Sequence, residues 1–232
     1  MKLAIMQPYF FPYIGYFQLM NAVDKFVIYD NIQYTKKGWI NRNRIIQNGH
    51  VKTFTIPLKK DSDYLNVCER QIADSFNSNK LCNQLINAYK KAPYFDDVYP
   101  LISKSIHYYE LNLFKYVFES LKAVCKYLHI DSSKIIVSST LLIDHLLKSE
   151  DKVLSICNSL GAIEYINPIG GVDLYSKDRF ELENIDLKFL KPKTVLHTQF
   201  GKDFLPNLSI IDVMMFHPQE KIKEMLNEYQ LI

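Results

Sequence analysis

Short apolar runs alternate with helical segments along this chain, and this alternation constrains its fold more than any other feature. Each run is too short for a typical helix but fits a strand that is buried on both faces. Strands that alternate with helices favour a parallel sheet. We therefore predict an α/β fold whose sheet is mainly parallel and flanked by helices. The expected strands are Leu3–Met6, Lys25–Asp30, Lys134–Val137, Ile163–Ile166 and Asp186–Leu190.

A hairpin and a helical segment are expected as insertions in this alternation. An Asn-Gly dipeptide between two β-rich stretches predicts an antiparallel hairpin at about 39–58. Apolar residues at helical spacing predict a helical insertion at about 81–129, which Pro93 and Pro100 should interrupt. Since one large α/β domain fits this length, we assign residues 1–232 to a single domain.

Capping residues mark several expected helix ends. The hydroxyl side chains of Ser138–Thr140 are typical of a helix start. Asp151 and Gly161 should cap the two ends of a helix over Lys152–Leu160. The expected helices are Tyr16–Ala22, Leu81–Ala92, Leu101–Leu128, Lys152–Leu160, Ser209–Phe216 and Glu220–Tyr229.

The composition argues against several classes of protein. A net charge of +3 is small for a dedicated nucleic-acid-binding protein. No stretch approaches the roughly 18 apolar residues of a membrane helix, and Pro8 and Pro12 interrupt the apolar start, so neither membrane insertion nor a signal peptide is expected. The four cysteines are widely spaced, which predicts buried thiols, no metal site and a reducing, cytoplasmic location.

The segment between the first expected strand and the first helix is a candidate binding loop. In open parallel sheets, ligands bind beyond the carboxyl ends of the strands, where helix N-termini offer free N–H groups to anions. A glycine there allows close approach to a phosphate. An equally supported interpretation is that the aromatic side chains pack the sheet edge and the prolines shape a turn. The candidate binding residues are Gln7, Tyr9, Phe11, Gly15 and Tyr16.

This loop resembles the nucleotidylyltransferase and pantothenate synthetase superfamily, in which a strand leads to an HxGH motif at a helix start. The corresponding residues are Tyr13-Ile-Gly-Tyr16, so both histidines are replaced. Ser138–Thr140 is similar to a serine/threonine motif of that superfamily, but the arginine that should follow is missing. The resemblance implies a Rossmann-like or nucleotidylyltransferase-like α/β fold. It also implies ATP and Mg²⁺ if a carboxylic acid is activated in place.

A basic and aromatic segment follows the second expected strand. No acidic residue lies between Asp30 and Asp61, whereas lysines and arginines are frequent there, and such a field suits an anionic ligand. Aromatic rings stack on sugars or bases, and amides hydrogen-bond to hydroxyl groups or base edges. Nucleic-acid binding and a solvated basic hairpin are the alternatives. The candidate binding residues are Gln33, Tyr34, Lys36, Lys37, Trp39, Asn41, Arg42 and Asn43.

Paired glycines follow the fourth expected strand. Gly170 and Gly171 are two of only seven glycines, so their adjacency indicates either a tight turn or a backbone that approaches a ligand closely. Asn167 and Asp173 would then face the substrate. The candidate binding residues of this segment are Asn167, Gly170, Gly171 and Tyr175.

Four segments resemble, in order, the successive signatures of the WbqC-like family of bacterial surface-polysaccharide biosynthesis proteins. They are QPYFFPYIGYFQL, YDNIQYTKKGWINRN, YINPIGGVDLY and LSIIDVMMF, and together they span nearly the whole chain. The resemblance implies a role in the synthesis of O-antigen lipopolysaccharide or capsule. It further implies the attachment of an amino acid such as glycine to a sugar.

Few side chains are candidates for acid or base catalysis, and no Ser/His/Asp set with a nucleophile elbow is recognisable. Asp30 ends a strand, although a turn cap explains it as well. His197 and His217 lie in expected loops, and histidine titrates near neutrality. We assign these three residues as catalytic candidates, with Asp30 or a loop histidine removing the proton of an attacking amine.

The leading hypothesis is a transferase that joins a small carboxylic acid, such as glycine, to the amino group of a nucleotide-linked sugar. The basic segment would hold the pyrophosphate, and the other two segments would hold the sugar or the acyl group. The alternatives are an ATP-dependent amide ligase resembling pantothenate synthetase and a non-catalytic protein that binds a sugar nucleotide or a glycosyltransferase. The expected partner is therefore a nucleotide-linked amino sugar or another phosphorylated small molecule, not a nucleic acid, and a homodimer is compatible with the sequence. All of these hypotheses require the three segments to meet around one cleft.

Overall fold

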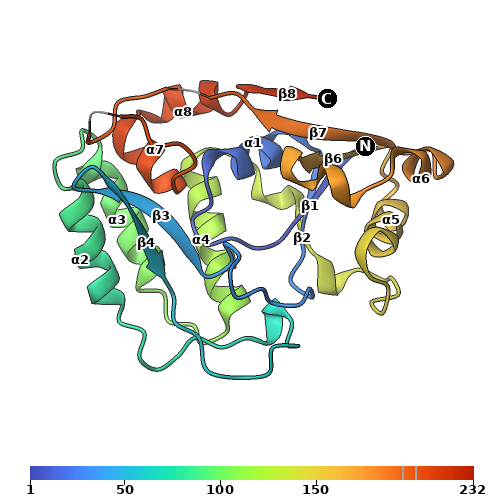
Figure 1. Cartoon of the computed structure of the whole chain (residues 1–232), viewed down its shortest axis with the longest axis horizontal. Helices are drawn as coiled ribbons and strands as arrows, with labels where there is room; N and C mark the ends of the chain where they lie inside the picture. Colours follow the sequence, from blue (N-terminus) through green and yellow to red (C-terminus); the bar gives the residue numbers. More distant parts are fainter. Residues whose placement is uncertain (195, 202) are drawn as a thin grey trace.

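A six-stranded sheet forms the centre of the computed structural model, which describes residues 1–194, 196–201 and 203–232. Its strands are β1 (Lys2–Met6), β2 (Lys25–Ile28), β5 (Ile135–Val137), β6 (Glu164–Pro168), β7 (Asp186–Pro192) and β8 (Tyr229–Leu231). They lie in the order β5-β2-β1-β6-β7-β8, as Figure 1 shows for the central strands. The neighbours from β5 to β7 pair in parallel, and β8 pairs antiparallel with β7. The predicted α/β fold with a mainly parallel sheet is confirmed.

Helices cover both faces of this sheet. They are α1 (Ile14–Ala22), α2 (Ser78–Tyr89), α3 (Phe95–Ile106), α4 (Leu113–Tyr127), α5 (Ser149–Leu160), α6 (Lys177–Leu182), α7 (Ile210–Phe216) and α8 (Gln219–Met225). Side chains of α5 and α6 form the core on one face, whereas those of α1, α4, α7 and α8 belong to the core on the other. In Figure 1, α5 and α6 lie on the right of the central strands and α2 to α4 on the left.

The strand residues alternate between these two cores because successive side chains of a strand point to opposite faces. Ile5 and Val27 pack with α5 and α6, whereas Ala4 and Phe26 pack with α1 and α4. All four are almost fully buried. Burial on both faces explains why these strands appear in the sequence as continuous apolar runs.

The expected hairpin is present as β3 (Arg42–Gln47) and β4 (His50–Thr55), which form a separate two-stranded antiparallel sheet. Asn48 and Gly49 at its turn have φ angles of 53° and 75°, and Asn-Gly is the dipeptide that adopts this left-handed conformation most readily. The hairpin lies beside α2 and α3 in Figure 1. Its inward side chains Ile45 and Phe54 belong to the same core as α1 and α4.

Pro100 lies inside α3, so the expected helix break before residue 101 was wrong. The break falls instead at residues 107–112, between α3 and α4. Proline cannot donate a hydrogen bond to the carbonyl of Asp96 four residues earlier. Both residues are exposed, so water can satisfy that carbonyl and the helix continues.

Helix α5 and the C-terminal segment also differ from their expected bounds. Asp151 lies in the first turn of α5 and is not its cap, because the helix begins at Ser149. Gly161 ends α5 in the left-handed conformation with φ 66°, as expected. The last expected helix is shorter, since Tyr229–Leu231 pairs with β7 as a strand.

All four cysteines are free thiols, and most of them are buried. Cys82, Cys125 and Cys157 are buried, whereas Cys68 is only half-buried, and none of the four forms a disulfide. Within residues 1–194, 196–201 and 203–232, no helix combines the length and the apolar character that crossing a bilayer requires.

Candidate functional site

A cleft of about 1560 Å³ lies at the carboxyl ends of the parallel strands. Residues that follow β1, β2, β6 and β7 line it together with the start of α5. This is the position at which open parallel sheets bind ligands. Lining residues from these five elements include Gln7, Asn31, Asn167, Lys191 and Ser149.

All three segments that the sequence singled out contribute to this cleft. The loop after β1, the segment before and within β3, and the paired-glycine segment after β6 are far apart in the sequence but line the same cavity. The candidate residues that line it are Gln7, Tyr9, Gln33, Trp39, Asn43, Asn167, Gly170, Gly171 and Tyr175.

The other candidates of the first loop support the cleft and do not line it. Phe11 and Tyr16 are almost fully buried, and the Tyr16 hydroxyl donates to the carbonyl of Gln7 at 3.0 Å. An added Cβ at Gly15 would clash with the ring of Tyr13, so this ring would have to move. Tyr9 is thus the aromatic candidate of this loop that reaches the cleft.

Most cations of the basic segment also lie outside the cleft lining. Lys36 pairs with Asp63 at 2.8 Å, and Lys37 is exposed. The guanidinium of Arg42 donates to the carbonyl of Gly38 at 3.0 Å. Arg44 is the basic side chain of this segment that lines the cleft, and its guanidinium lies 4.9 Å from the ring centre of Trp39.

Tyr34 and Asn41 have structural roles. The Tyr34 hydroxyl donates to Oδ1 of Asn41 at 2.9 Å, and Nδ2 of Asn41 donates to the carbonyl of Ile56 at 2.7 Å. Both side chains are largely buried, and they join the segment before the hairpin to the residue that follows its second strand. These hydrogen bonds leave them outside the cleft.

Asn43 connects the basic segment to the first loop. Its Nδ2 donates to the carbonyls of Phe10 and Phe11 at 3.1 and 2.8 Å. The hydroxyl of Ser209 donates to the same Phe11 carbonyl at 2.7 Å. Phe11 has a φ of 42°, which is rare for a bulky residue, so these hydrogen bonds hold the loop in a conformation that its own backbone does not favour.

The paired-glycine segment after β6 forms another part of the cleft wall. An added Cβ at Gly171 would clash with Oδ1 of Asn167, whereas one at Gly170 would meet no atom within 4 Å. Nδ2 of Asn167 donates to the hydroxyl of Tyr165 at 2.7 Å. The ring of Tyr175 packs edge-on against that of Tyr165, so Asn167 and Tyr175 are fixed from behind.

Asp30 is a turn cap and lies behind the cleft wall. Only 2% of its surface is exposed, and its Oδ1 accepts the backbone N–H of Ser139 at 2.9 Å. The next residue, Asn31, does line the cleft and bonds to Nδ1 of His145 at 2.9 Å. Since Nε2 of His145 bonds to the carbonyl of Leu141 at 3.0 Å, both ring nitrogens of this histidine are engaged.

The cleft wall carries an excess of positive charge. Glu150 and Asp173 are its acidic residues, and Arg179 already pairs with Glu150 at 2.9 Å. Such a wall attracts anionic ligands. Sequence analysis did not single out the lysines of this wall. Lys148 and Lys152 lie in a polar stretch that is typical of a solvated surface, and Lys191 directly follows an expected strand. The cationic lining residues are Arg44, Lys148, Lys152 and Lys191.

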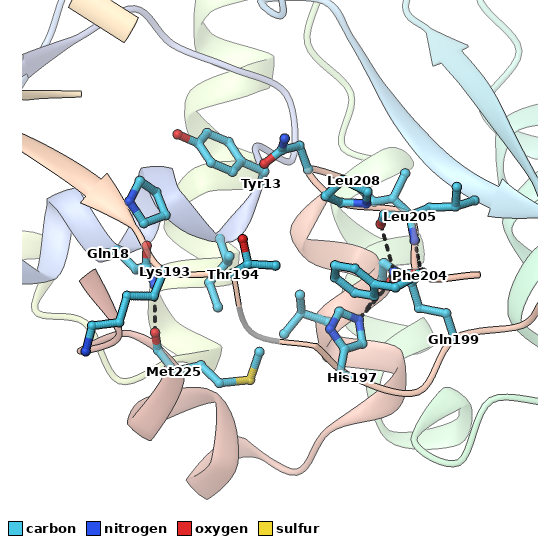
Figure 2. A pocket seen from close by; sticks show the side chains of 16 residues that line it. Tyr13, Gln18, Lys193, Thr194, His197, Gln199, Phe204, Leu205, Leu208 and Met225 are labelled. Carbon is cyan, nitrogen blue, oxygen red and sulfur yellow. Dashed lines mark hydrogen bonds and ion pairs between the residues drawn. The ribbon is translucent and has the colours of Figure 1, made fainter. Parts of the chain in front are cut away.

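A second, smaller cavity of about 100 Å³ adjoins the cleft. The two cavities share four lining residues, namely Tyr13, Pro192, Thr194 and Asn207. In Figure 2, His197, Gln199 and Phe204 lie on one side of the small cavity and Lys193 and Thr194 on the other. His197 therefore lies next to the cleft and not within its own lining.

His197 is oriented by a buried carboxylate. Its Nε2 lies 3.1 Å from Oδ2 of the fully buried Asp212. Tyr89 and Gln199 donate to the same carboxylate at 2.9 and 2.7 Å. Among the described residues, Nδ1 of His197 is buried and has no hydrogen-bond partner. A histidine fixed by a carboxylate on one nitrogen, with the other unpartnered, has the arrangement of a general base.

His217 lies behind His197, with 5.0 Å between the ring centres, and is absent from the linings of both cavities. Burial lowers its pKa, and the neighbouring His197 adds to this effect. Asp212, which sequence analysis did not select, could have been found as the only acidic residue in the apolar LSIIDVMMF segment.

The residues at the HxGH positions do not fit an ATP site of that type. Tyr13 lines both cavities, but Tyr16 is buried and bonds to the Gln7 carbonyl. Neither side chain can supply the cationic donor that an imidazole offers to a triphosphate.

Comparisons with known proteins identify a family for this chain. The sequence model of the WbqC-like protein family matches residues 7–224. The uncharacterized protein Rv1507c of Mycobacterium tuberculosis (strain ATCC 25618 / H37Rv) is 28% identical over 171 residues, which cover 72% of this chain and 71% of that relative. No solved structure is significantly similar to the chain.

Proposed function

The chain belongs to the WbqC-like protein family, and from this premise we propose that it is an enzyme of bacterial surface-polysaccharide synthesis. In this proposal it transfers a small acyl group, such as that of an amino acid, to the amino group of a nucleotide-linked sugar. The acyl group arrives already activated, because the HxGH positions do not fit ATP. The unpaired cysteines support a reducing, cytoplasmic location.

One observation carries the proposal: two adjoining cavities differ greatly in size and character. The large cleft exceeds the roughly 300–1,000 Å³ of an ordinary small-molecule site and has cationic, aromatic and amide side chains, which suits a sugar nucleotide. The small cavity of about 100 Å³ has the volume of roughly three water molecules, which suits an acyl group of a few atoms. The shared residue Thr194 marks where the two substrates would meet.

His197 is the base that this geometry favours. The amine nitrogen forms the amide bond to the acyl carbon, and the bond from that carbon to its activating group breaks. Nδ1 of His197 takes the amine proton and passes it to the leaving group, while Asp212 stabilises the imidazolium. Asp30 has no such role, because its carboxylate caps the turn at Ser139.

Purified protein incubated with an amino sugar nucleotide and a glycyl or acetyl thioester tests the proposal. Mass spectrometry should detect the acylated sugar nucleotide. Asp212→Asn and His197→Gln should lower the rate about 10²-fold or more, the typical contribution of a general base. His50→Gln, at an exposed position of the hairpin, is the matched control and should keep full activity. Tight binding of the sugar nucleotide without acylation by any donor would instead indicate a non-catalytic binding protein.

A further inference from the structure

Lys152 is a buried cation in the wall of the large cleft. Only 3% of its surface is exposed. Its Nζ lies 3.3 and 3.5 Å from the carbonyl oxygens of His145 and Asn31, and 5.0 Å from the ring centre of Tyr29. All three of these neighbours line the cleft, so the ammonium group lies at the cleft wall.

This ammonium group is poorly compensated within the chain. Both carbonyl contacts are longer than the 2.7–3.2 Å of ordinary N–H···O hydrogen bonds. Among the described residues Lys152 forms no ion pair, although Asp30 and Asp144 act on it through space. Burial lowers the pKa of Lys152. Because a buried charge without a partner is costly, a site that retains one is suited to an anion that arrives from the cleft.

The start of α5 adds donors at the same place. This helix has twelve residues, and no side chain caps its N-terminus. Lys148 and Ser149 line the cleft, so the positive end of the helix dipole faces the same cavity as Lys152. The two acidic side chains of the first turn, Glu150 and Asp151, pair with Arg179 at 2.9 and 2.7 Å, and its single positive charge offsets one of their two negative charges.

We propose that Lys152, Lys148 and the first turn of α5 form a phosphate subsite that binds the pyrophosphate of the substrate. The position of this subsite replaces the one expected at Lys36, Lys37 and Arg42, which lie outside the cleft lining. The inference rests on the proposed function only for the identity of the phosphorylated molecule. A nucleotide sugar and a free nucleotide carry the same pyrophosphate group, so both are included as probes.

Trp39 provides a direct readout, since it is the single tryptophan of the chain and lines the cleft. Titration of the full chain with inorganic pyrophosphate should change its fluorescence, and calorimetry should give the same dissociation constant. Lys152→Gln removes the charge but keeps donors for the two carbonyls. We expect it to weaken pyrophosphate binding about tenfold or more, because hydrogen bonds to charged groups contribute most among polar contacts.

A second variant covers the case in which Lys152→Gln does not fold, and a control variant measures the effect of losing one positive charge elsewhere. Lys148→Gln changes an exposed residue of the subsite, so it should fold normally and weaken binding several-fold. Lys223→Gln removes the same charge at an exposed position of α8, outside the cleft, and should leave the affinity for pyrophosphate within about twofold of that of the unsubstituted protein. Absence of pyrophosphate binding by both methods, or equal affinity in all three variants, would overturn the subsite.

UDP, ATP and a UDP-linked amino sugar distinguish the source of the pyrophosphate and separate this inference from the proposed function. If the protein binds the sugar nucleotide more strongly than ATP, and Lys152→Gln loses this binding, the result supports both the subsite and the sugar nucleotide as its ligand. Pyrophosphate binding that depends on Lys152, without any acyl transfer, would refute the transferase and leave the subsite intact. Acyl transfer with a KM for the sugar nucleotide that Lys152→Gln does not raise would refute the subsite and support the transferase.

Discussion

Replacement of Asn43 by alanine should destabilise the protein through the loop it holds. The change removes two buried hydrogen bonds, at 3.1 and 2.8 Å, to the carbonyls of Phe10 and Phe11, and a third in which Oδ1 of Asn43 accepts the backbone N–H of Arg44 at 2.8 Å. The hydroxyl of Ser209 still bonds to the Phe11 carbonyl, but no other hydrogen bond to the Phe10 carbonyl occurs among the described residues. A buried acceptor without a partner costs about 1–3 kcal/mol, and loss of each of the other two bonds costs about 0.5–1.5 kcal/mol.

These contributions predict that Asn43→Ala lowers the free energy of unfolding by about 2–6 kcal/mol. For a chain of this size, that corresponds to a fall in Tm of roughly 4–24 °C. Thermal and urea unfolding followed by circular dichroism measure the effect. Asn158→Ala is the matched control, because this exposed asparagine makes one hydrogen bond, to Glu183, and should change stability by less than about 0.5 kcal/mol. If Asn43→Ala costs no more than the control, the loop does not depend on this amide.

Three further predictions concern His217, Tyr89 and the paired glycines. Burial lowers the pKa of His217 below its ordinary 6.5, so below about pH 6.5 the unfolded chain binds more protons than the folded one, and the free energy of unfolding falls as the pH is lowered. His217→Gln should reduce the difference in Tm between pH 7.5 and pH 5.5, and an unchanged difference would contradict this. Tyr89→Phe leaves a buried carboxylate oxygen without its 2.9 Å donor and should cost about 1–3 kcal/mol in urea unfolding, whereas no loss would mean that water replaces the hydroxyl. Gly171→Ala should displace Asn167 and weaken sugar-nucleotide binding several-fold in fluorescence titrations, while Gly170→Ala should not, and equal affinities would exclude this packing role.

The sheet could be predicted from the sequence because its signals are local. Burial on both faces produces short apolar runs, and the helices between them end at recognisable residues such as Gly161. The missed strand, Tyr229–Leu231, has no such signal. It contains a polar residue, lies at the sheet edge and becomes a strand only by pairing with β7, which a local pattern cannot show.

The candidate site could be predicted only in outline. The three segments were expected to share one cleft, and they do. The individual roles were harder, because a side chain's role depends on neighbours from distant segments. Asp30 and Lys152 show this best: the carboxylate bonds to Ser139, over one hundred residues away, while the lysine, which resembles an ordinary surface residue in sequence, is buried by the loops around it.

Two of the four family-like segments stabilise the conformation of the loop after β1. Phe11 adopts its unusual backbone angle under the hydrogen bonds of Asn43 and Ser209, which come from the second and the last of the four family-like segments. Ser209 also caps the N-terminus of α7, the helix that carries Asp212 and so orients His197. A change that releases this loop should therefore disturb both cavities together, whereas a change at Lys152 should affect only the large one. Comparing Asn43→Ala with Lys152→Gln for sugar-nucleotide affinity and for the acylation rate of bound substrate would separate these effects: the first variant should lower both, and the second only the affinity.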